Sequence, residues 1–164
     1  VTKPQAHLYC FCDIDHFHWL RSEFEAAGWW CFRTPLIWYK KSNMRAPWPE
    51  NGPQRKYETL LYAVKGKRPI LKMAPDVLDY PSDTNLGNAA QKPVALFKDL
   101  LSRSVLPGQA VLDPFMGSGT IFEAAHDLKC RATGIELDQA SYGIAVGRLE
   151  RLKAQGELDL AVGL

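Results

Sequence analysis

The sequence contains no apolar run long enough to cross a membrane. Its hydrophobic stretches stay well short of the roughly 18 residues that a spanning helix needs. A charged-then-apolar leader of the secretory type is also missing. Cysteine is scarce, and three of the four cysteines lie in apolar segments, where free cysteine behaves as a small hydrophobe. These absences predict a cytoplasmic protein with reduced thiols and no membrane partner.

A convincing metal-ligand pattern is absent as well. Cys10, Cys12, His16 and His18 form a C-x-C-x3-H-x-H cluster. The cysteines fall in a predicted strand and the histidines on the following predicted helix, where residues two apart point in different directions. We therefore expect no metal site.

Acidic residues are nearly missing from one part of the chain. Between Arg33 and Lys72 there are ten basic and two acidic residues, a net charge of +8, whereas the remainder carries −6. Aromatic residues lie among these charges, namely Trp38, Tyr39, Trp48 and Tyr57. Cations beside aromatic rings suit phosphates beside bases, so this segment predicts a DNA-binding face. A solvated loop that merely maintains solubility is the alternative.

Strand and helix patterns alternate along the chain. Strands are expected at 6–14, 32–40, 57–66, 109–114 and 131–138, with Pro35 interrupting the second. Helices are expected at 15–28 from Asp15 to Gly28, at 92–108 with Pro93 in the first turn, at 119–130 and at 138–156 with Asp138 as cap. This alternation predicts an α/β fold with a doubly wound, mostly parallel sheet.

The stretch VLDPFMGSGT, residues 111–120, joins a strand to a helix through a glycine-rich turn. Gly117 and Gly119 allow the backbone to approach a ligand closely, and the helix N-terminus lies behind them. Glu136 follows Gly117 by nineteen residues, at the end of the next strand, where an acid can accept both hydroxyls of a ribose. NAD and S-adenosylmethionine fit this pattern equally.

Asp113, at the mouth of the turn, separates the two cofactors. A carboxylate a few ångströms from a pyrophosphate costs about 4 kcal/mol at an effective dielectric near 20. S-adenosylmethionine carries a cationic sulfonium and an ammonium, which an acid attracts. The third glycine of the dinucleotide pattern is replaced by Phe122, and no Gly-Lys-Ser/Thr follows the turn. The sequence therefore favours the methyl donor, with an unliganded turn and an NAD site as alternatives.

These residues resemble those of the DNA amino-methyltransferases, which methylate adenine N6 or cytosine N4. DPFMGSGT is similar to the family's cofactor motif, GIELD to its ribose-binding motif, and QKPVALFKDLLSRSVLPG to its Lys-Pro helix. The helix and glycine motif come last in the permuted beta subgroup, as here. PLIWYKK and QRKYETLLYAVKG resemble middle strands of prophage-type members, so the likeness covers most of residues 6–150.

The resemblance implies a Rossmann-like methyltransferase fold that binds S-adenosylmethionine and acts on DNA, as in restriction-modification systems, with adenine N6 favoured over cytosine N4. It implies one domain over 1–164, divided into substrate-side strands with a basic loop (6–66), an irregular connection (67–88) and a cofactor-binding part (89–155). The implied cofactor residues are Asp113, Phe115, Met116, Gly117, Gly119, Thr120, Glu136, Lys92 and Pro93. The implied substrate residues are Trp38, which would stack near a flipped base, Lys40 and Arg55. An ordinary half-buried strand residue is the alternative for Trp38.

The family's catalytic motif, Asp/Asn/Ser-Pro-Pro-aromatic, does not occur in the 164 residues. No catalytic residue is therefore assigned, and we expect an incomplete methyltransferase that contributes the cofactor-binding portion. A catalytically inactive module that binds DNA or a partner is the alternative. A sheet without its central strand should also self-associate or be completed by another chain.

Overall fold

The computed structural model describes residues 2–41, 50, 52–53, 55–82, 91–155 and 160–163. The chain divides into two compact units, Val1–Ser82 and Asp83–Leu164, here called the first and second units. Their boundary falls within the segment expected to be an irregular connection, of which residues 83–88 lie outside the described residues. The assignment of 1–164 to one domain stays a prediction.

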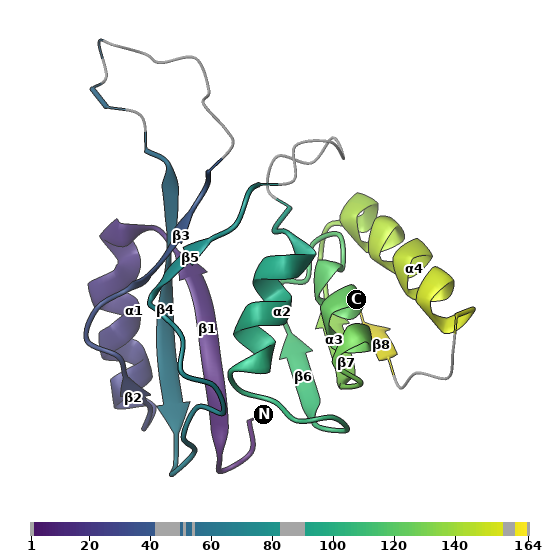
Figure 1. Ribbon diagram of the computed structural model, residues 1–164, viewed down its shortest axis with the longest axis horizontal. Coiled ribbons are helices and arrows are strands. Elements are labelled where there is room, and N and C mark those ends of the chain that lie inside the picture. Colours follow the sequence, from purple (N-terminus) through teal and green to yellow (C-terminus); the bar gives the residue numbers. More distant parts are fainter. Residues whose placement is uncertain are drawn as a thin grey trace. The chain divides into compact units, whose positions relative to one another are not determined.

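In the described residues of the first unit there are one helix and five strands, and Figure 1 shows how they are arranged. The strands form one sheet in the order β1-β4-β3-β5, with β2 also paired to β4. The elements are β1 (Ala6–Cys12), α1 (Ile14–Ala26), β2 (Trp30–Cys31), β3 (Leu36–Tyr39), β4 (Tyr57–Lys65) and β5 (Val77–Asp79). The short strands β2 and β5 were not predicted, and Pro35 precedes β3 instead of interrupting it.

Pairing in this sheet is mostly antiparallel, which corrects the expectation of mostly parallel strands for this part of the chain. β4 runs antiparallel to β1, β2 and β3, and the parallel pair is β3 with β5. The sequence between β3 and β4 contains three prolines and a glycine. Antiparallel strands can be joined without the long crossover connection that parallel strands need.

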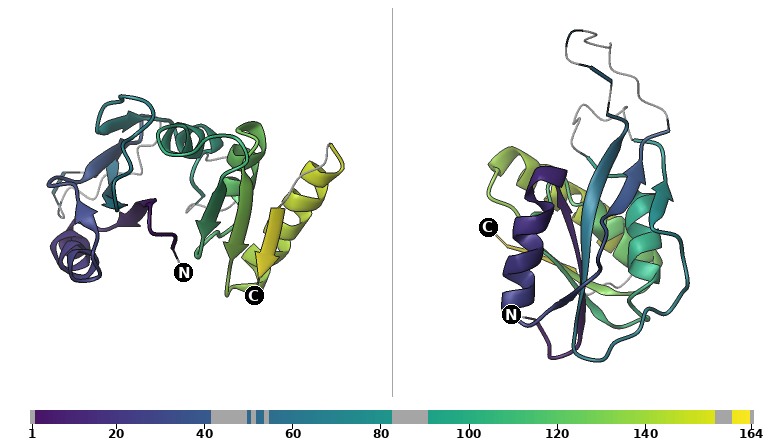
Figure 2. Two further views of the ribbon diagram at one scale, coloured as in Figure 1. Left: turned by 90° about the horizontal axis from the view of Figure 1, so that it is seen from below. Right: turned by 90° about the vertical axis from the view of Figure 1, so that its left-hand side faces the viewer.

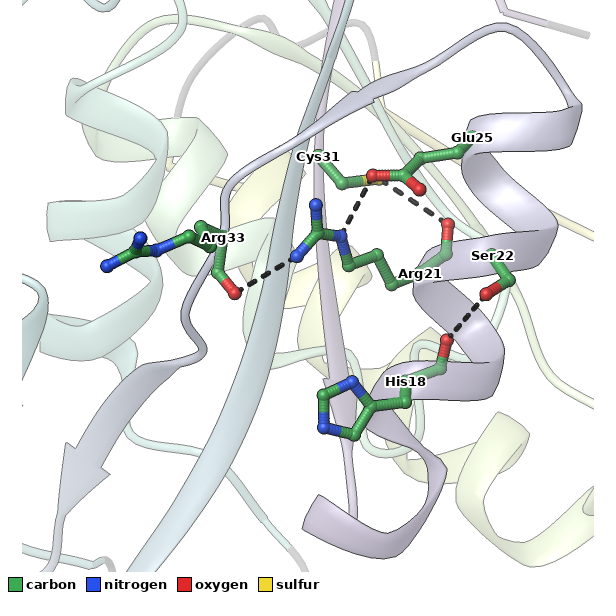
Figure 3. A network of polar contacts seen from close by, with 6 residues as sticks. All are labelled: His18, Arg21, Ser22, Glu25, Cys31 and Arg33. Atoms are coloured by element: carbon green, nitrogen blue, oxygen red, sulfur yellow. Dashed lines mark hydrogen bonds and ion pairs between the residues drawn. The ribbon is translucent and has the colours of Figure 1, made fainter.

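Helix α1 packs on one face of this sheet through Phe17, which shares a core cluster with Leu61 and Ala63 of β4 (Figure 2). Its N-cap is Asp13, whose side chain accepts a hydrogen bond from the Asp15 backbone N–H at 3.3 Å, so the predicted cap at Asp15 is wrong by two residues. Arg21 connects the helix to the segment before β3: its Nε donates to Glu25 at 2.8 Å and its Nη1 to the Arg33 carbonyl at 3.3 Å (Figure 3).

The second unit alternates helices with parallel strands, as the sequence predicts (Figure 1). Its elements are α2 (Val94–Ser102), β6 (Ala110–Asp113), α3 (Thr120–Asp127), β7 (Arg131–Ile135), α4 (Gln139–Lys153) and β8 (Leu160–Gly163). The strands pair in the order β6-β7-β8, both pairs parallel. The α/β class is confirmed, while β8 was not predicted.

The core of the second unit lies between its helices and one face of β7. Ala132 and Gly134 are buried there and alternate with exposed Thr133. Within the described part of this unit, β6 has a strand neighbour on one edge only, and its Leu112 is 44% exposed. The carboxyl ends of β6 and β7 therefore lie side by side, with Asp113 opposite Gly134.

Candidate cofactor site

Residues 114–119, the glycine loop, connect the end of β6 to the start of α3. Gly117 and Gly119 have φ angles of +55° and +75°, the left-handed region that glycine adopts without strain. A Cβ on Gly119 would lie 2.9 Å from the Cβ of Ala145 on α4. The two glycines are thus required by backbone conformation and, at Gly119, also by packing.

Four backbone N–H groups of the glycine loop already donate hydrogen bonds within the protein. The N–H of Phe115 donates to Asp113 Oδ1 at 3.0 Å, and that of Gly117 to Glu136 Oε2 at 2.8 Å. Those of Met116 and Gly119 donate to the backbone carbonyls of Ile135 and Met116, at 3.1 and 3.0 Å. A phosphate-binding loop presents such donors to its ligand, whereas this loop uses them to hold its own shape.

Glu136 follows β7 directly and joins the ends of the two strands. Its Oε2 accepts from Gly117, and its Oε1 accepts from the backbone N–H of Asp138 at 2.9 Å. A carboxylate offers about four acceptor positions, so one lone pair on each oxygen remains for a ligand. The side chain therefore has the capacity to accept two further donors, such as the hydroxyls of a ribose.

Asp113 sits where the two strands end. Burial raises the pKa of its carboxyl above the usual range, the Phe115 N–H opposes this, and the neighbouring Glu136 raises the pKa further. Two carboxylates close to each other in a partly dehydrated position produce a negative potential. The charged form of Asp113 gains stability when a cation lies beside it.

Two large apolar side chains are exposed at the ends of these strands. Phe115 in the glycine loop is 84% exposed, and Leu137, next to Glu136, is 88% exposed. Exposed apolar groups at the strand ends that also carry a polar acceptor suit a flat ligand ring with a sugar attached. Sequence reasoning missed Leu137, although its place after the ribose acid was the available signal.

Other predicted cofactor residues lie deeper. Met116 is 5% exposed and belongs to the core, and a Cβ on Gly134 would collide with its sulfur, so its side chain is a packing group and its predicted cofactor contact is not supported. Thr120 is 3% exposed at the first position of α3. Lys92 is half-buried, and Pro93 is buried at the N-cap of α2, one position before its predicted place in the helix.

The predicted substrate residues lie in the first unit. Trp38 on β3 is 1% exposed, and its Nε1 donates to the Tyr80 carbonyl at 2.8 Å. The Nζ of Lys40 lies 4.9 Å from the centre of the Trp38 ring. The same atom forms an ion pair with Oε1 of Glu58 at 2.5 Å. A base cannot stack on a ring so covered, so the prediction for Trp38 is not supported and the packing alternative holds.

Arg55 forms an ion pair with Asp13, the N-cap of α1, at 2.7 Å. Lys41 is likewise paired with Asp79 at 3.3 Å. Several cations of the basic segment are thus neutralised by acids of the same unit. Trp48 and Arg45 lie outside the described residues.

No cluster of three or more His, Cys, Asp or Glu side chains that could hold a metal ion is found among the residues that the structure describes. Over the same residues, no helix is long and apolar enough to span a membrane.

A strand, a glycine loop, a helix and an acid after the next parallel strand define a Rossmann-like cofactor-binding protein. A model of the DNA methylase family, N6_N4_Mtase, matches residues 1–146. The chain therefore belongs to the N6_N4_Mtase family of DNA methylases, which confirms the resemblance seen in the sequence.

Individual relatives agree with this assignment. The chain is 30% identical over 139 residues to the type II methyltransferase M.SmaI of Serratia marcescens, covering 74% of this chain and 47% of that protein. It is 45% identical over 62 residues to the type II methyltransferase M.HindIII of Haemophilus influenzae, covering 38% of this chain and 20% of that protein. The chain thus spans less than half the length of the curated relatives it matches.

Solved structures share the fold. The complex of M1.HpyAVI with SAM superimposes with a TM-score of 0.78 at 26% identity, covering 90% of this chain and 76% of that one. The cytosine-N4-specific PvuII DNA methyltransferase gives a TM-score of 0.70 at 15% identity, covering 98% and 73%. The Rossmann-like methyltransferase fold is thereby confirmed.

Proposed function

We propose that this chain binds S-adenosylmethionine at the carboxyl ends of β6 and β7 and forms the methyl-donor side of a DNA amino-methyltransferase. The observation that carries the proposal is the pairing of a half-buried acid, Asp113, with a loop whose N–H groups already donate hydrogen bonds within the protein. Asp113 favours a cation, and the glycine loop has its Phe115, Met116, Gly117 and Gly119 donors already bonded. A dinucleotide pyrophosphate would need those donors and would meet the two acids.

Each part of the cofactor has a matching residue. Glu136 would accept the two ribose hydroxyls with its remaining lone pairs, and Phe115 and Leu137 would contact the adenine ring. Asp113 would attract the cationic methionine end, with Lys92 and Pro93 close to it in the site. When bound, the cofactor supplies an electrophilic methyl group. The protein's part is to orient it and to exclude water.

The substrate we propose is the exocyclic amino group of a DNA base, adenine N6 in preference to cytosine N4. Membership in the N6_N4_Mtase family supports an exocyclic amino group as the target, of adenine or of cytosine alike. The basic residues of the first unit would contact DNA phosphates. A base inside a duplex has to be extruded before its amino group can reach a methyl donor. Nucleoside analysis of methylated DNA separates the two targets.

The 164 residues contain no Asp/Asn/Ser-Pro-Pro-aromatic motif. We therefore propose that the groups that hold the target amine come from other polypeptide. In the described part of each unit, β6 and β1 have a strand partner on one edge only. An unpaired edge seeks another strand, so completion by another segment or by a second copy is expected. The missing motif equally favours the second candidate function, an inactive module that binds DNA or a partner.

The proposal is tested by thermal unfolding and by methyl transfer. S-adenosylmethionine and S-adenosylhomocysteine should each raise the melting temperature, while NAD should not. Transfer of labelled methyl groups to DNA should be undetectable with this chain alone. A shift with NAD and none with the methyl donor would reject the cofactor assignment, and efficient transfer by the chain alone would reject the division of the catalytic site.

A further inference from the structure

Arg148 of α4 is a buried cation with two partners in the cofactor-binding part of the chain. It is 6% exposed, and its Nε donates to the backbone carbonyl of Ser118 at 3.0 Å. Its Nη1 donates to the carboxylate of Glu123 in the first turn of α3. A buried guanidinium persists where its charge and its donors are satisfied, so these contacts determine where the side chain lies.

Ser118 belongs to the glycine loop and is held from a second side. Its hydroxyl donates to Oε1 of Gln91 at 2.8 Å, and both residues are buried. Gln91 directly precedes Lys92 and Pro93, the residues proposed to lie near the methionine end of the cofactor. The chain Gln91–Ser118–Arg148–Glu123, here called the loop network, thus connects three segments around the proposed site.

A packing contact supports the same arrangement independently. Ala145 precedes Arg148 by three residues, so the two side chains project from the same side of α4. Ala145 lies against Gly119: a Cβ added to Gly119 would lie 2.9 Å from the Cβ of Ala145. Helix α4 therefore approaches the glycine loop closely at Gly119 and bonds to it at Ser118.

We propose that Arg148 is a positioning residue for the cofactor: through the Ser118 carbonyl it fixes the loop conformation that places the Gly117 N–H on Glu136. Glu123 neutralises the guanidinium, so no uncompensated positive charge lies near a cationic ligand. The effect on ligand affinity rests on the proposed function. The effect on the loop does not.

The test combines hydrogen exchange of the ligand-free chain with binding of S-adenosylhomocysteine. In Arg148→Met, the amides of residues 115–119 should exchange about tenfold faster or more, while those of β7 change less. Affinity for S-adenosylhomocysteine should fall by a similar factor. Arg148→Lys should be intermediate, because a lysine keeps the charge but lacks the planar fork that directs Nε and Nη1 to two different partners. Arg151→Met is the matched control, because Arg151 and Arg148 line one surface hollow with Glu123 and Arg151 is exposed.

Unchanged exchange of the loop in Arg148→Met, or equal acceleration throughout the second unit, would overturn the positioning role. If that variant does not fold, Arg148→Lys decides by the same two measurements. Failure of the wild-type chain to bind S-adenosylhomocysteine would reject the proposed function, and the ligand-free exchange would still decide the role of Arg148.

Discussion

The carboxylate of Glu136 accepts a hydrogen bond from the backbone N–H of Gly117 at 2.8 Å, across two neighbouring strand ends and nineteen residues of sequence. This bond makes the acid part of the loop as well as part of the site. It also turns a donor that would face an anionic ligand toward a protein carboxylate. The relationship explains how a glycine loop with the outline of a phosphate site suits a cationic cofactor.

Replacing Glu136 should therefore affect both the loop and the ligand. Glu136 accepts hydrogen bonds from the N–H groups of Gly117 and Asp138. In Glu136→Gln, the NH2 group of the new side chain would face one of these two N–H donors, and that hydrogen bond would be lost. We expect affinity for S-adenosylhomocysteine to fall about tenfold or more, as measured by calorimetry. Glu150→Gln, an exposed acid on α4, is the control and should bind as the wild type does. Equal affinity in the two variants would remove Glu136 from the site.

Ligand binding should depend on pH through Asp113. Because its folded-state pKa is raised, the folded chain holds this proton more tightly than the unfolded chain does. The contribution of Asp113 to the free energy of unfolding is then greatest at acid pH. It declines as the pH rises from the ordinary pKa of an aspartate to the raised pKa of Asp113 in the folded chain. A cationic ligand prefers the ionised carboxylate, so affinity for S-adenosylmethionine should rise over the same window.

Asp113→Asn should remove that pH dependence. Calorimetric titrations of the ligand at several pH values, from about 4 to about 8, will compare the variant with the wild type. The same titrations with Asp127→Asn serve as the control, because Lys98 and His126 hold the pKa of that exposed carboxyl below its usual value. A pH profile that persists in Asp113→Asn would assign the titration to another group.

Two glycines provide a matched pair for stability. Gly119→Ala introduces a Cβ at φ +75° and within 2.9 Å of Ala145, so we expect a loss of about 1–3 kcal/mol in the free energy of unfolding. Gly143→Ala lies in α4, and apart from the helix's own backbone no atom comes within 4 Å of the new Cβ, so we expect a gain of up to about 1 kcal/mol. Urea denaturation measures both. Equal effects of the two substitutions would contradict the packing of α4 on the loop.

DNA affinity should depend on salt through the basic segment. Three of its cations, Lys40, Lys41 and Arg55, are already in ion pairs. Lys67 is exposed beyond the end of β4. Lys67→Gln should weaken binding uniformly across DNA sequences and reduce the slope of log affinity against log salt by about one. Fluorescence anisotropy at several salt concentrations is the measurement. Lys153→Gln, an exposed lysine of the second unit, should leave the slope unchanged, and an equal loss there would disfavour a localised DNA face.

The second unit was more predictable from sequence than the first. Its helices carry clear apolar spacing, and glycine and the Asp138 cap mark their ends, so β6, α3, β7 and α4 lie where expected. The first unit pairs strands through long-range contacts that no local pattern records. β2 and β5 have two and three residues, too short for an alternation to be recognised.

Residue types and spacing identified the acids and glycines of the candidate site, but not how their hydrogen bonds are shared. Nothing local indicates that Arg148, thirty residues after Ser118, bonds to the glycine loop. For Trp38 the sequence predicted a binding role that the structure does not support. A tryptophan among cations is typical of a base-stacking residue, but this one is buried. Whether a residue packs in the core or binds a ligand therefore depends on contacts with residues distant in sequence, which only the structure gives.

Calorimetric titration of S-adenosylmethionine into the wild-type chain and into Asp113→Ala tests the central claim most directly. We expect one binding site in the wild type, an affinity lower by about tenfold or more in the variant, and no heat with NAD. Equal binding by both proteins, or binding of NAD in place of S-adenosylmethionine, would contradict it.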